Sequence, residues 1–206
     1  MSYPTKRISS GTYVFDVYEE VYEPAEDSFL FVDNLEVHAD EVVLDLGTGS
    51  GILAVLAAKT AGSVVAVDLN PYAIRCAKEN AKHNRMMSKI SFLQSDLFSA
   101  FAAGTQFDVV LFNAPYLPSE KDEQDTWIGR SWAGGANGRE IVDRFIAEAP
   151  RYLKLNGRIL LMQSTLTGIQ ETLSKFDAVS FEASIKAAQK LPFFETLTLI
   201  EAKRNP

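Results

Sequence analysis

Short apolar runs alternate with helix-forming segments from residue 41 onward, and this alternation constrains the fold more than any other feature of the chain. The expected strands lie at 42–44, 64–67, 90–93, 107–112 and 158–162, and the expected helices at 51–60, from 71 onward, at 139–153 and at 168–176. Strands that are apolar along their whole length are typical of a parallel sheet with helices on both faces. Two further strands, near 178–188 and 194–203, have no helix between them and predict an antiparallel hairpin at one edge. The predicted fold class is therefore α/β, with a mostly parallel, seven-stranded sheet.

A looser pattern precedes these repeats. Apolar residues alternate at Tyr13, Phe15 and Val17, which indicates a short strand or hairpin, and residues 26–35 have the pattern of a helix. We therefore expect an N-terminal extension, residues 1–40, that packs on a core formed by residues 41–206 within a single structural domain.

Composition narrows the cellular setting and the classes of partner. Hydrophobic residues make up 47% of the 206, enough for a sizeable core, and the formal net charge is −7. Without a run of Lys and Arg, such a chain is poorly suited to bind nucleic-acid phosphates directly. A single cysteine, Cys76, excludes an internal disulfide, and residues 1–7 lack an apolar signal core. The expectation is a soluble, cytoplasmic protein that does not associate with membranes.

The strand at 107–112 ends in a group of residues suited to hold an amino or amide group. Asn113 and Ala114 each offer a carbonyl oxygen that could accept a hydrogen bond from a planar NH2 group. Pro115 fixes the turn, and the ring of Tyr116 could pack against the same plane. The carboxyl ends of parallel strands are also where open α/β sheets bind ligands. The alternative is that Asn113 is a plain turn residue.

Acidic residues end the three preceding strands and predict a nucleoside site. Asp45 opens the glycine-rich turn 45–51, Asp68 ends the second strand, and Asp96 follows the third. A carboxylate at Asp68 can accept from both ribose hydroxyls, and Asp96 or the next main-chain N–H can contact an adenine edge. The spacing in the turn is tighter than G-x-G-x-x-G, which argues against NAD and favours S-adenosylmethionine. Alternatively, these aspartates are solvated strand ends and helix caps.

With these motifs together, the chain resembles a known family. Residues 43–51 (VLDLGTGSG), Asp68 and residues 113–116 (NAPY) resemble a class I S-adenosylmethionine-dependent methyltransferase of Rossmann-like fold that acts on nitrogen. Residues 21–30 (VYEPAEDSFL) and 132–145 (WAGGANGREIVDRF) are similar to the HemK-type family. That family methylates the glutamine of the Gly-Gly-Gln motif in class 1 translation release factors. The short N-terminus resembles the archaeal and eukaryotic branch.

The resemblance assigns roles to individual residues. It implies that Asn113 and the carbonyl of Ala114 accept the two hydrogens of the substrate amide, that Pro115 shapes the loop, and that Tyr116 packs on the amide plane. The residues implied to bind S-adenosylmethionine, and its product S-adenosylhomocysteine, are Tyr22, Glu26, Ser28, Asp45, Gly47, Thr48, Gly49, Asp68, Leu69, Asp96, Leu97 and Asn113. Residues 134–135 and the helix 139–153 are implied to support the substrate pocket. No general base is expected.

One position departs from the family pattern. The motif usually carries two prolines, and the first of them is Ala114 in this chain. The carbonyl of residue 114 is retained, and Pro115 still biases it toward extended geometry. We therefore expect a somewhat less rigid loop and retained chemistry.

The remaining candidates have plainer interpretations. His38 and His83 have no Cys or carboxylate at ligand spacing, so no metal site is predicted. Cys76, among apolar helical positions, is expected to be a buried small residue. Trp127 and Trp132 are candidate loop anchors. The acidic run 120–125 is either a solvated loop or a lid that would suit a basic protein loop.

The strand at 90–93 is expected at an edge of the sheet, where an apolar strand invites pairing with another chain. The resemblance implies a small zinc-binding activator protein that adds its own strand there; the alternative is an edge covered by the chain's own loops.

Two other functions remain open. An N6-adenine or other exocyclic-amino methyltransferase on DNA or RNA would use the same amino-group holder but needs a basic channel or a recognition domain. A non-catalytic cofactor-binding subunit would require a damaged holder or turn. Neither feature is evident, so the sequence favours glutamine methylation of a release factor.

Overall fold

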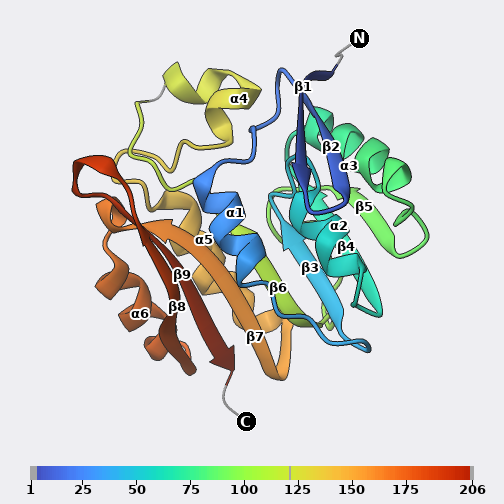
Figure 1. Ribbon diagram of the computed structural model, residues 1–206. Coiled ribbons are helices and arrows are strands. Elements are labelled where there is room, and N and C mark those ends of the chain that lie inside the picture. Colours follow the sequence, from blue (N-terminus) through green and yellow to red (C-terminus); the bar gives the residue numbers. More distant parts are fainter. Residues whose placement is uncertain (1–3, 121, 205–206) are drawn as a thin grey trace.

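The computed structural model describes residues 4–120 and 122–204, and its strands and helices alternate as the sequence predicts (Figure 1). The strands are β1 (Pro4–Ser10), β2 (Tyr13–Tyr18), β3 (Val42–Leu46), β4 (Ser63–Asp68), β5 (Ile90–Gln94), β6 (Phe107–Asn113), β7 (Leu153–Ser164), β8 (Phe181–Lys190) and β9 (Thr196–Arg204). The helices are α1 (Glu26–Asp33), α2 (Ile52–Ala58), α3 (Pro71–His83), α4 (Trp127–Arg130), α5 (Glu140–Glu148) and α6 (Ile169–Ala178). None of the helices in the described part of the chain is long and apolar enough to cross a membrane.

Seven strands form one sheet in the order β5-β4-β3-β6-β7-β9-β8. The first five are parallel, and β9 pairs antiparallel with both β7 and β8. The predicted fold class is therefore confirmed, including the antiparallel hairpin at one edge. Within the hairpin, β9 lies on the inner side, between β7 and β8, so β8 and β5 are the two edge strands of the described sheet. The strand order reverses direction between β3 and β6, and α/β sheets bind ligands at such a point.

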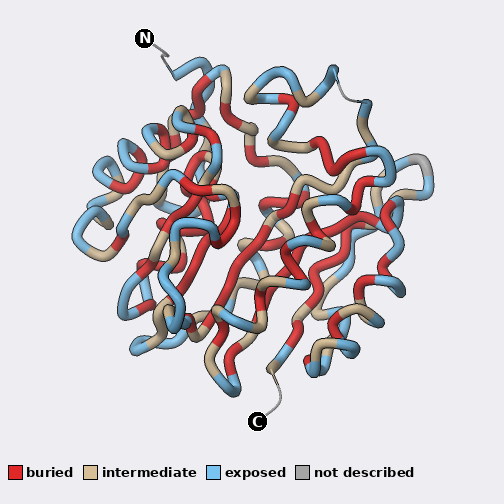
Figure 2. The backbone as a smooth tube through the Cα atoms, turned by 180° about the vertical axis from the view of Figure 1, so that it is seen from behind, coloured by how far each residue is buried: buried red, intermediate tan, exposed pale blue. Residues whose placement is uncertain are grey.

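The apolar strands bury both of their faces, because successive side chains point to opposite sides of the sheet. Leu44, Val110 and Phe112 pack with α5 and α6 on one side, whereas Val43 and Leu111 pack with α1 and α2 on the other. Figure 2 shows that the buried residues follow the central strands, while exposed residues lie on the outer turns of the helices and loops.

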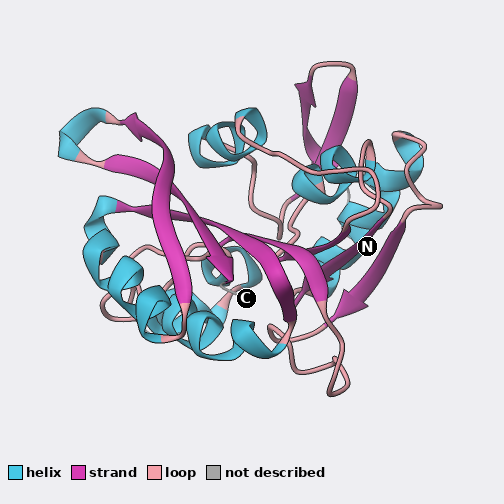
Figure 3. Ribbon diagram, turned by 90° about the horizontal axis from the view of Figure 1, so that it is seen from below, coloured by secondary structure: helices cyan, strands magenta, loops and turns pink. Residues whose placement is uncertain are grey.

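The hairpin β1–β2 stands apart from the main sheet (Figure 3) and packs on α3 through a small apolar cluster. Val17 and Tyr18 of the hairpin contact Cys76 of α3, whose side chain is buried. Asn80, also on α3, accepts from the backbone N–H of Asp16 at 2.9 Å. This hairpin starts earlier than the alternation at residues 13–17 predicts.

The prediction of one helix over 139–153 is wrong at its end. The helix α5 ends at Glu148, a 3₁₀ turn covers Ala149–Arg151, and Leu153 already belongs to β7. Pro150 lacks the backbone N–H that would continue the helix, and it favours the first turn instead. The apolar Leu153 matches helical spacing but pairs with Phe107 in the sheet.

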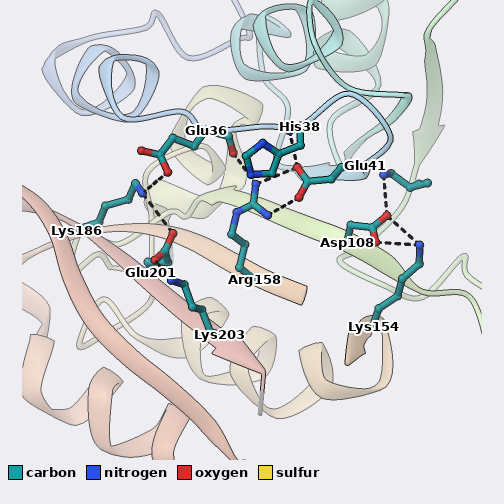
Figure 4. Close-up of polar contacts among 10 residues, drawn as sticks. Glu36, His38, Glu41, Asp108, Lys154, Arg158, Lys186, Glu201 and Lys203 are labelled. Atoms are coloured by element: carbon teal, nitrogen blue, oxygen red, sulfur yellow. Dashed lines mark hydrogen bonds and ion pairs between the residues drawn. The ribbon is translucent and has the colours of Figure 1, made fainter. Parts of the chain in front are cut away.

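Ion pairs join the loop before β3 to the strands on the other side of the sheet (Figure 4). Arg158 Nη2 on β7 lies 2.9 Å from Oε2 of Glu41, and both side chains are mostly buried. Lys154 lies 2.9 Å from Asp108, which also accepts from the backbone N–H of Val42. Lys186 bridges Glu36 and Glu201 at 3.0 and 3.3 Å, and Lys203 lies 3.1 Å from Glu201. These contacts fix the amino-terminal ends of β3, β6 and β7, opposite the end where the site lies.

Candidate functional site

A cavity of about 640 Å³ opens at the carboxyl ends of β3, β4 and β6, where the strand order reverses. Its floor is formed by the turns that follow these strands, and the loop before α1 and the segment around α4 contribute the rest of its lining. In Figure 1, α4 and the start of α1 lie at this end of the sheet. Segments far apart in the sequence therefore meet around one cavity.

The glycine-rich turn after β3 brings the backbone close to the cavity. Gly47 and Gly49 have φ of +64° and +54°, a region that glycine adopts without steric cost. Residue 51 must be glycine for a second reason: a Cβ at this position would lie only 2.8 Å from the Cβ of Ala77 on α3. Thr48 lines the cavity and donates its hydroxyl to Oδ2 of Asp45 at 2.7 Å.

Asp45 and Asp68 are acidic groups with raised pKa values. Burial raises the pKa of Asp45 to about 7, opposed by the hydrogen bond from Thr48. Desolvation likewise raises the pKa of Asp68 to about 6, although this carboxylate accepts from the backbone N–H groups of Asn70 at 2.8 Å and Gly49 at 2.9 Å. Oδ1 of Asp45 is buried and has no hydrogen-bond partner among the described residues. Asp68 stands at the rim of the cavity, where its remaining lone pairs can accept from a ligand.

Three other predicted residues line the same side. Leu69 leaves 44% of its surface exposed beside the cavity, while Leu97 is 8% exposed. Asp96 also lines the cavity, and one of its oxygens lies 2.9 Å from Nη2 of Arg144 on α5. Two apolar side chains and a carboxylate in the same lining suit a flat heteroaromatic ring that has a polar edge.

The loop after β6 brings the predicted amide holder to the cavity. Asn113, Ala114, Pro115 and Tyr116 all line it, and Ala114 is buried. Nδ2 of Asn113 donates to Oδ2 of Asp27 at 3.0 Å. Oδ1 of Asn113 is buried without a hydrogen-bond partner in the described residues. A buried acceptor without a partner costs free energy, so a donor supplied by a ligand would be favourable there.

Residues 21–30 contribute to the cavity lining, but only some of the residues predicted from this motif line it. Tyr22 and Ser28 line it, as predicted, but Glu26 is exposed and does not. Asp27, which no prediction singled out, lines the cavity and is 5% exposed. Its position four residues before the buried Phe31 on α1 is the signal that could have identified it, because residues at this spacing share a helix face.

Two glycines in the segment before α5, Gly134 and Gly138, contact the loop that carries the amide holder. The backbone of Gly134 donates to the carbonyl of Leu117 at 2.8 Å, and Leu117 donates to Trp132 at 2.9 Å. Gly138 packs against the backbone of Tyr116. Arg139, 3% exposed, donates to the carbonyl of Gly168 and the hydroxyl of Thr172, both at 3.0 Å. The loop that carries the holder is thereby fixed to the start of α6.

Trp127 and Trp132 both contribute to the lining, together with Gln124 and Arg130. Arg130 stacks over the ring of Trp127 at 5.0 Å. In the acidic run 120–125, residues 122–125 form a 3₁₀ turn with exposed carboxylates, and Lys121 lies outside the described residues. Within the described ranges no group of three or more His, Cys, Asp and Glu side chains could hold a metal ion.

The lining fits S-adenosylmethionine. Asp68 offers acceptors for hydroxyls, Leu69 and Leu97 offer apolar surface, and Gly47 and Gly49 have no side chains that would fill the space. The unpaired oxygen of Asn113 leaves acceptor capacity for a further donor. Asp45, predicted to bind the cofactor, does not line the cavity and contacts it only through Thr48. The cavity volume also suits a ligand of this size.

Comparison with known proteins adds three findings. The family model of the ribosomal protein L11 methyltransferase matches residues 27–114, less than half of the chain. The chain is 47% identical to a putative protein N5-glutamine methyltransferase of Methanocaldococcus jannaschii, over 91% of this chain and 94% of that protein. It is 35% identical to the mouse methyltransferase HEMK2, over 70% of this chain and 72% of the relative.

A solved structure is also similar in fold. It is the E. cuniculi Mtq2-Trm112 complex, described as responsible for the methylation of the eRF1 translation termination factor. The similarity has a TM-score of 0.71 and a sequence identity of 26%, and it covers 90% of this chain and 99% of that one.

Proposed function

Because this chain belongs to the HemK-type family of protein N5-glutamine methyltransferases, we propose that it methylates the side-chain amide nitrogen of the glutamine in the Gly-Gly-Gln motif of a class 1 translation release factor. The relatives named as release factor glutamine methyltransferases and as an eRF1 methyltransferase support this substrate. The methyl donor is S-adenosylmethionine.

The amide holder carries the reaction. Oδ1 of Asn113 and the carbonyl of Ala114 accept the two hydrogens of the substrate amide, and the ring of Tyr116 packs on its plane. The unpaired Oδ1 of Asn113 is the single observation that supports this assignment most directly. Ala114 serves as well as the usual proline for this purpose, since only its carbonyl is used.

The cofactor occupies the side of the cavity formed by β3, β4 and the segment after β5. Asp68 accepts from the ribose hydroxyls, Leu69 and Leu97 pack on the adenine, and Asp96 lies at its edge. The methionine end is lined by the turn residues Gly47, Thr48 and Gly49 and by Tyr22 and Ser28. Asp45 lies behind this turn, where it accepts a hydrogen bond from Thr48. When bound, S-adenosylmethionine supplies a methyl group on a positively charged sulfur.

The protein's contribution is to make a poor nucleophile reactive. An amide lone pair is delocalised into its carbonyl, and two acceptors on the N–H hydrogens return electron density to nitrogen. They also fix the direction of attack, and positioning of this kind contributes several kcal/mol, of order 7–11 in the best cases. We assign no general base, because an amide alkylated on nitrogen is acidic enough to lose its proton to water.

We further propose that a small zinc-binding activator protein adds a strand to the edge at β5. The solved complex of a similar catalytic chain with Trm112 supports a partner of this kind. Among the described strands β5 pairs only with β4, and this free edge supports the position.

The test is transfer of a labelled methyl group to a purified class 1 release factor, with and without the activator. The matched controls are the factor with its Gly-Gly-Gln glutamine changed to asparagine and the enzyme with Asn113→Ala. We expect label on the native factor only, and a loss of about 100-fold or more in Asn113→Ala. Label on adenine in single-stranded nucleic acid instead would favour the nucleic-acid methyltransferase, and no transfer to either would indicate a cofactor-binding subunit.

A further inference from the structure

The carboxylate of Asp27 is the point at which the polar groups of the site meet. Oδ2 accepts from Nδ2 of Asn113 at 3.0 Å and from the hydroxyl of Tyr116 at 3.4 Å. Oδ1 accepts from the hydroxyl of Tyr22 at 3.2 Å and from the backbone N–H of Ser28 at 2.6 Å. Asp27 thus connects α1 to both functional residues of the loop after β6.

We infer that Asp27 is a positioning residue for methyl transfer, which acts by fixing the orientation of the Asn113 side-chain amide. This inference rests on the proposed function, in which Oδ1 of Asn113 accepts a hydrogen from the substrate. Asp27 touches neither the reacting nitrogen nor the methyl group in this scheme, so its effect passes through Asn113.

The argument depends on the different hydrogen-bonding capacities of the two side chains. An ionised carboxylate only accepts, whereas one end of an amide donates and the other accepts. Asp27 therefore binds the NH2 end of Asn113 and leaves the carbonyl end for the substrate. If the amide turned over, its oxygen would face the carboxylate and its NH2 group would face the hydrogens of the substrate amide, and both contacts would be repulsive.

The two tyrosines reinforce this arrangement. Burial, with the nearby charge of Asp27, raises the pKa of Tyr22 and of Tyr116 well above the ordinary range, so both hydroxyls keep their protons and donate. Among the described residues, no Lys or Arg forms an ion pair with Asp27, and these hydrogen bonds compensate its burial. A carboxylate held in this way has one stable orientation.

The test compares Asp27→Asn with Asp33→Asn. Asparagine retains the shape of Asp27 but can present either end to Asn113, while Asp33 lies on the same helix and is exposed. We expect Asp27→Asn to lower kcat on the release factor about 100-fold, with the Kd for S-adenosylmethionine and the KM for the factor within threefold of wild type. Asp33→Asn should leave all three unchanged.

Two results would overturn the inference: a kcat within threefold of wild type, or a Kd for S-adenosylmethionine that rises as much as kcat/KM falls. The second result would make Asp27 a cofactor ligand. If Asp27→Asn does not fold, the side-chain amide resonances of Asn113 in the wild-type protein decide. One proton shifted downfield and protected from exchange supports the contact, and two unshifted protons contradict it. If the wild type transfers no methyl group at all, the proposed function fails, and this measurement still tests the contact.

Discussion

Gly138 packs directly against the carbonyl oxygen of Tyr116, so that a methyl group on residue 138 would overlap this oxygen. The same methyl group would lie 3.1 Å from the backbone nitrogen of Pro118. The shape of the loop that carries the amide holder therefore depends on a residue that follows it by about twenty positions and has no functional group of its own.

Gly138→Ala should distort this loop and reduce methyl transfer more than it reduces cofactor binding. Gly138 has a φ of +72°, which costs an alanine about 1–2 kcal/mol, and the overlap adds a similar amount. Gly104→Ala is the matched control, because Gly104 has a φ of +88° and a Cβ there would meet nothing within 4 Å. Thermal unfolding and kcat measured on both variants separate the cost of placing alanine at a positive φ from the effect of distorting the loop that carries the amide holder. Equal kcat values for the two variants would contradict the role given to Gly138.

Arg139, which precedes α5, and Arg144, in the middle of α5, should differ greatly in their contribution to stability. Arg139 is buried, pairs with Asp143 at 2.8 Å and donates to the residues before α6. Removing a buried charged donor leaves its acceptors unpaired, so Arg139→Ala should cost about 3–5 kcal/mol in the free energy of unfolding. Arg144 pairs with Asp96 while both side chains remain about half exposed, and Arg144→Ala should cost about 1 kcal/mol or less. Urea unfolding of the two variants tests the difference, and similar losses would count against it.

The order of the strands and helices could be predicted from the sequence because apolar strands and amphipathic helices have local patterns. An element boundary could not be predicted where the same spacing of apolar residues fits both a helix and a strand. Leu153 fits both a helix face and a strand, and only the pairing with Phe107 decides between them. Pro150 was the local sign that α5 must end earlier.

The site was less predictable than the fold because some of its residues act through contacts that the sequence does not record. The predicted strand-end residues Asp68 and Asn113 line one cavity, since parallel strands end at the same edge, whereas Asp45 is buried behind the turn and does not line it. Asp27 comes from a helix 86 positions before Asn113, and their contact depends on how α1 crosses the sheet. The choice between Glu26 and Asp27 was likewise decided by the rotation of that helix.

The stability of the free protein should fall as the pH rises from 5 to 8. The pKa values of Asp45 and Asp68 are raised to about 7 and about 6 by burial, whereas an unfolded aspartate titrates near 3.9. A group with a raised pKa stabilises the fold fully below its unfolded pKa, and this contribution is lost as the pH passes its folded pKa. The carboxylates with lowered pKa values act at more acidic pH: Asp16, Glu41, Glu79, Asp108, Glu171 and Glu201. Melting curves of wild type and Asp45→Asn test this, and the variant should show a smaller decrease.

Affinity for S-adenosylmethionine should have the opposite dependence on pH. The proposed contact of Asp68 with the ribose hydroxyls needs the ionised carboxylate, and protonation removes part of its capacity to accept. Since the pKa of Asp68 is raised to about 6, affinity should weaken as the pH falls from 7.5 to 5.5. Calorimetric titration at the two pH values measures this change. Asp68→Asn should bind weakly at both, and an unchanged pH dependence in this variant would exclude Asp68 as the source.

The proposed partner at β5 predicts a difference between two substitutions of the same residue. The backbone N–H of Ser95 donates to Asp68 on β4, so the alternation along a parallel strand directs the N–H of Gln94 toward the free edge. Gln94→Ala and Gln94→Pro both remove the exposed side chain, but only proline removes this N–H. We expect the alanine variant to co-purify with the activator and the proline variant to lose it, with equal affinity for S-adenosylmethionine. Retention of the activator by both variants would mean that it binds elsewhere, and loss by both would mean that the glutamine side chain makes the contact.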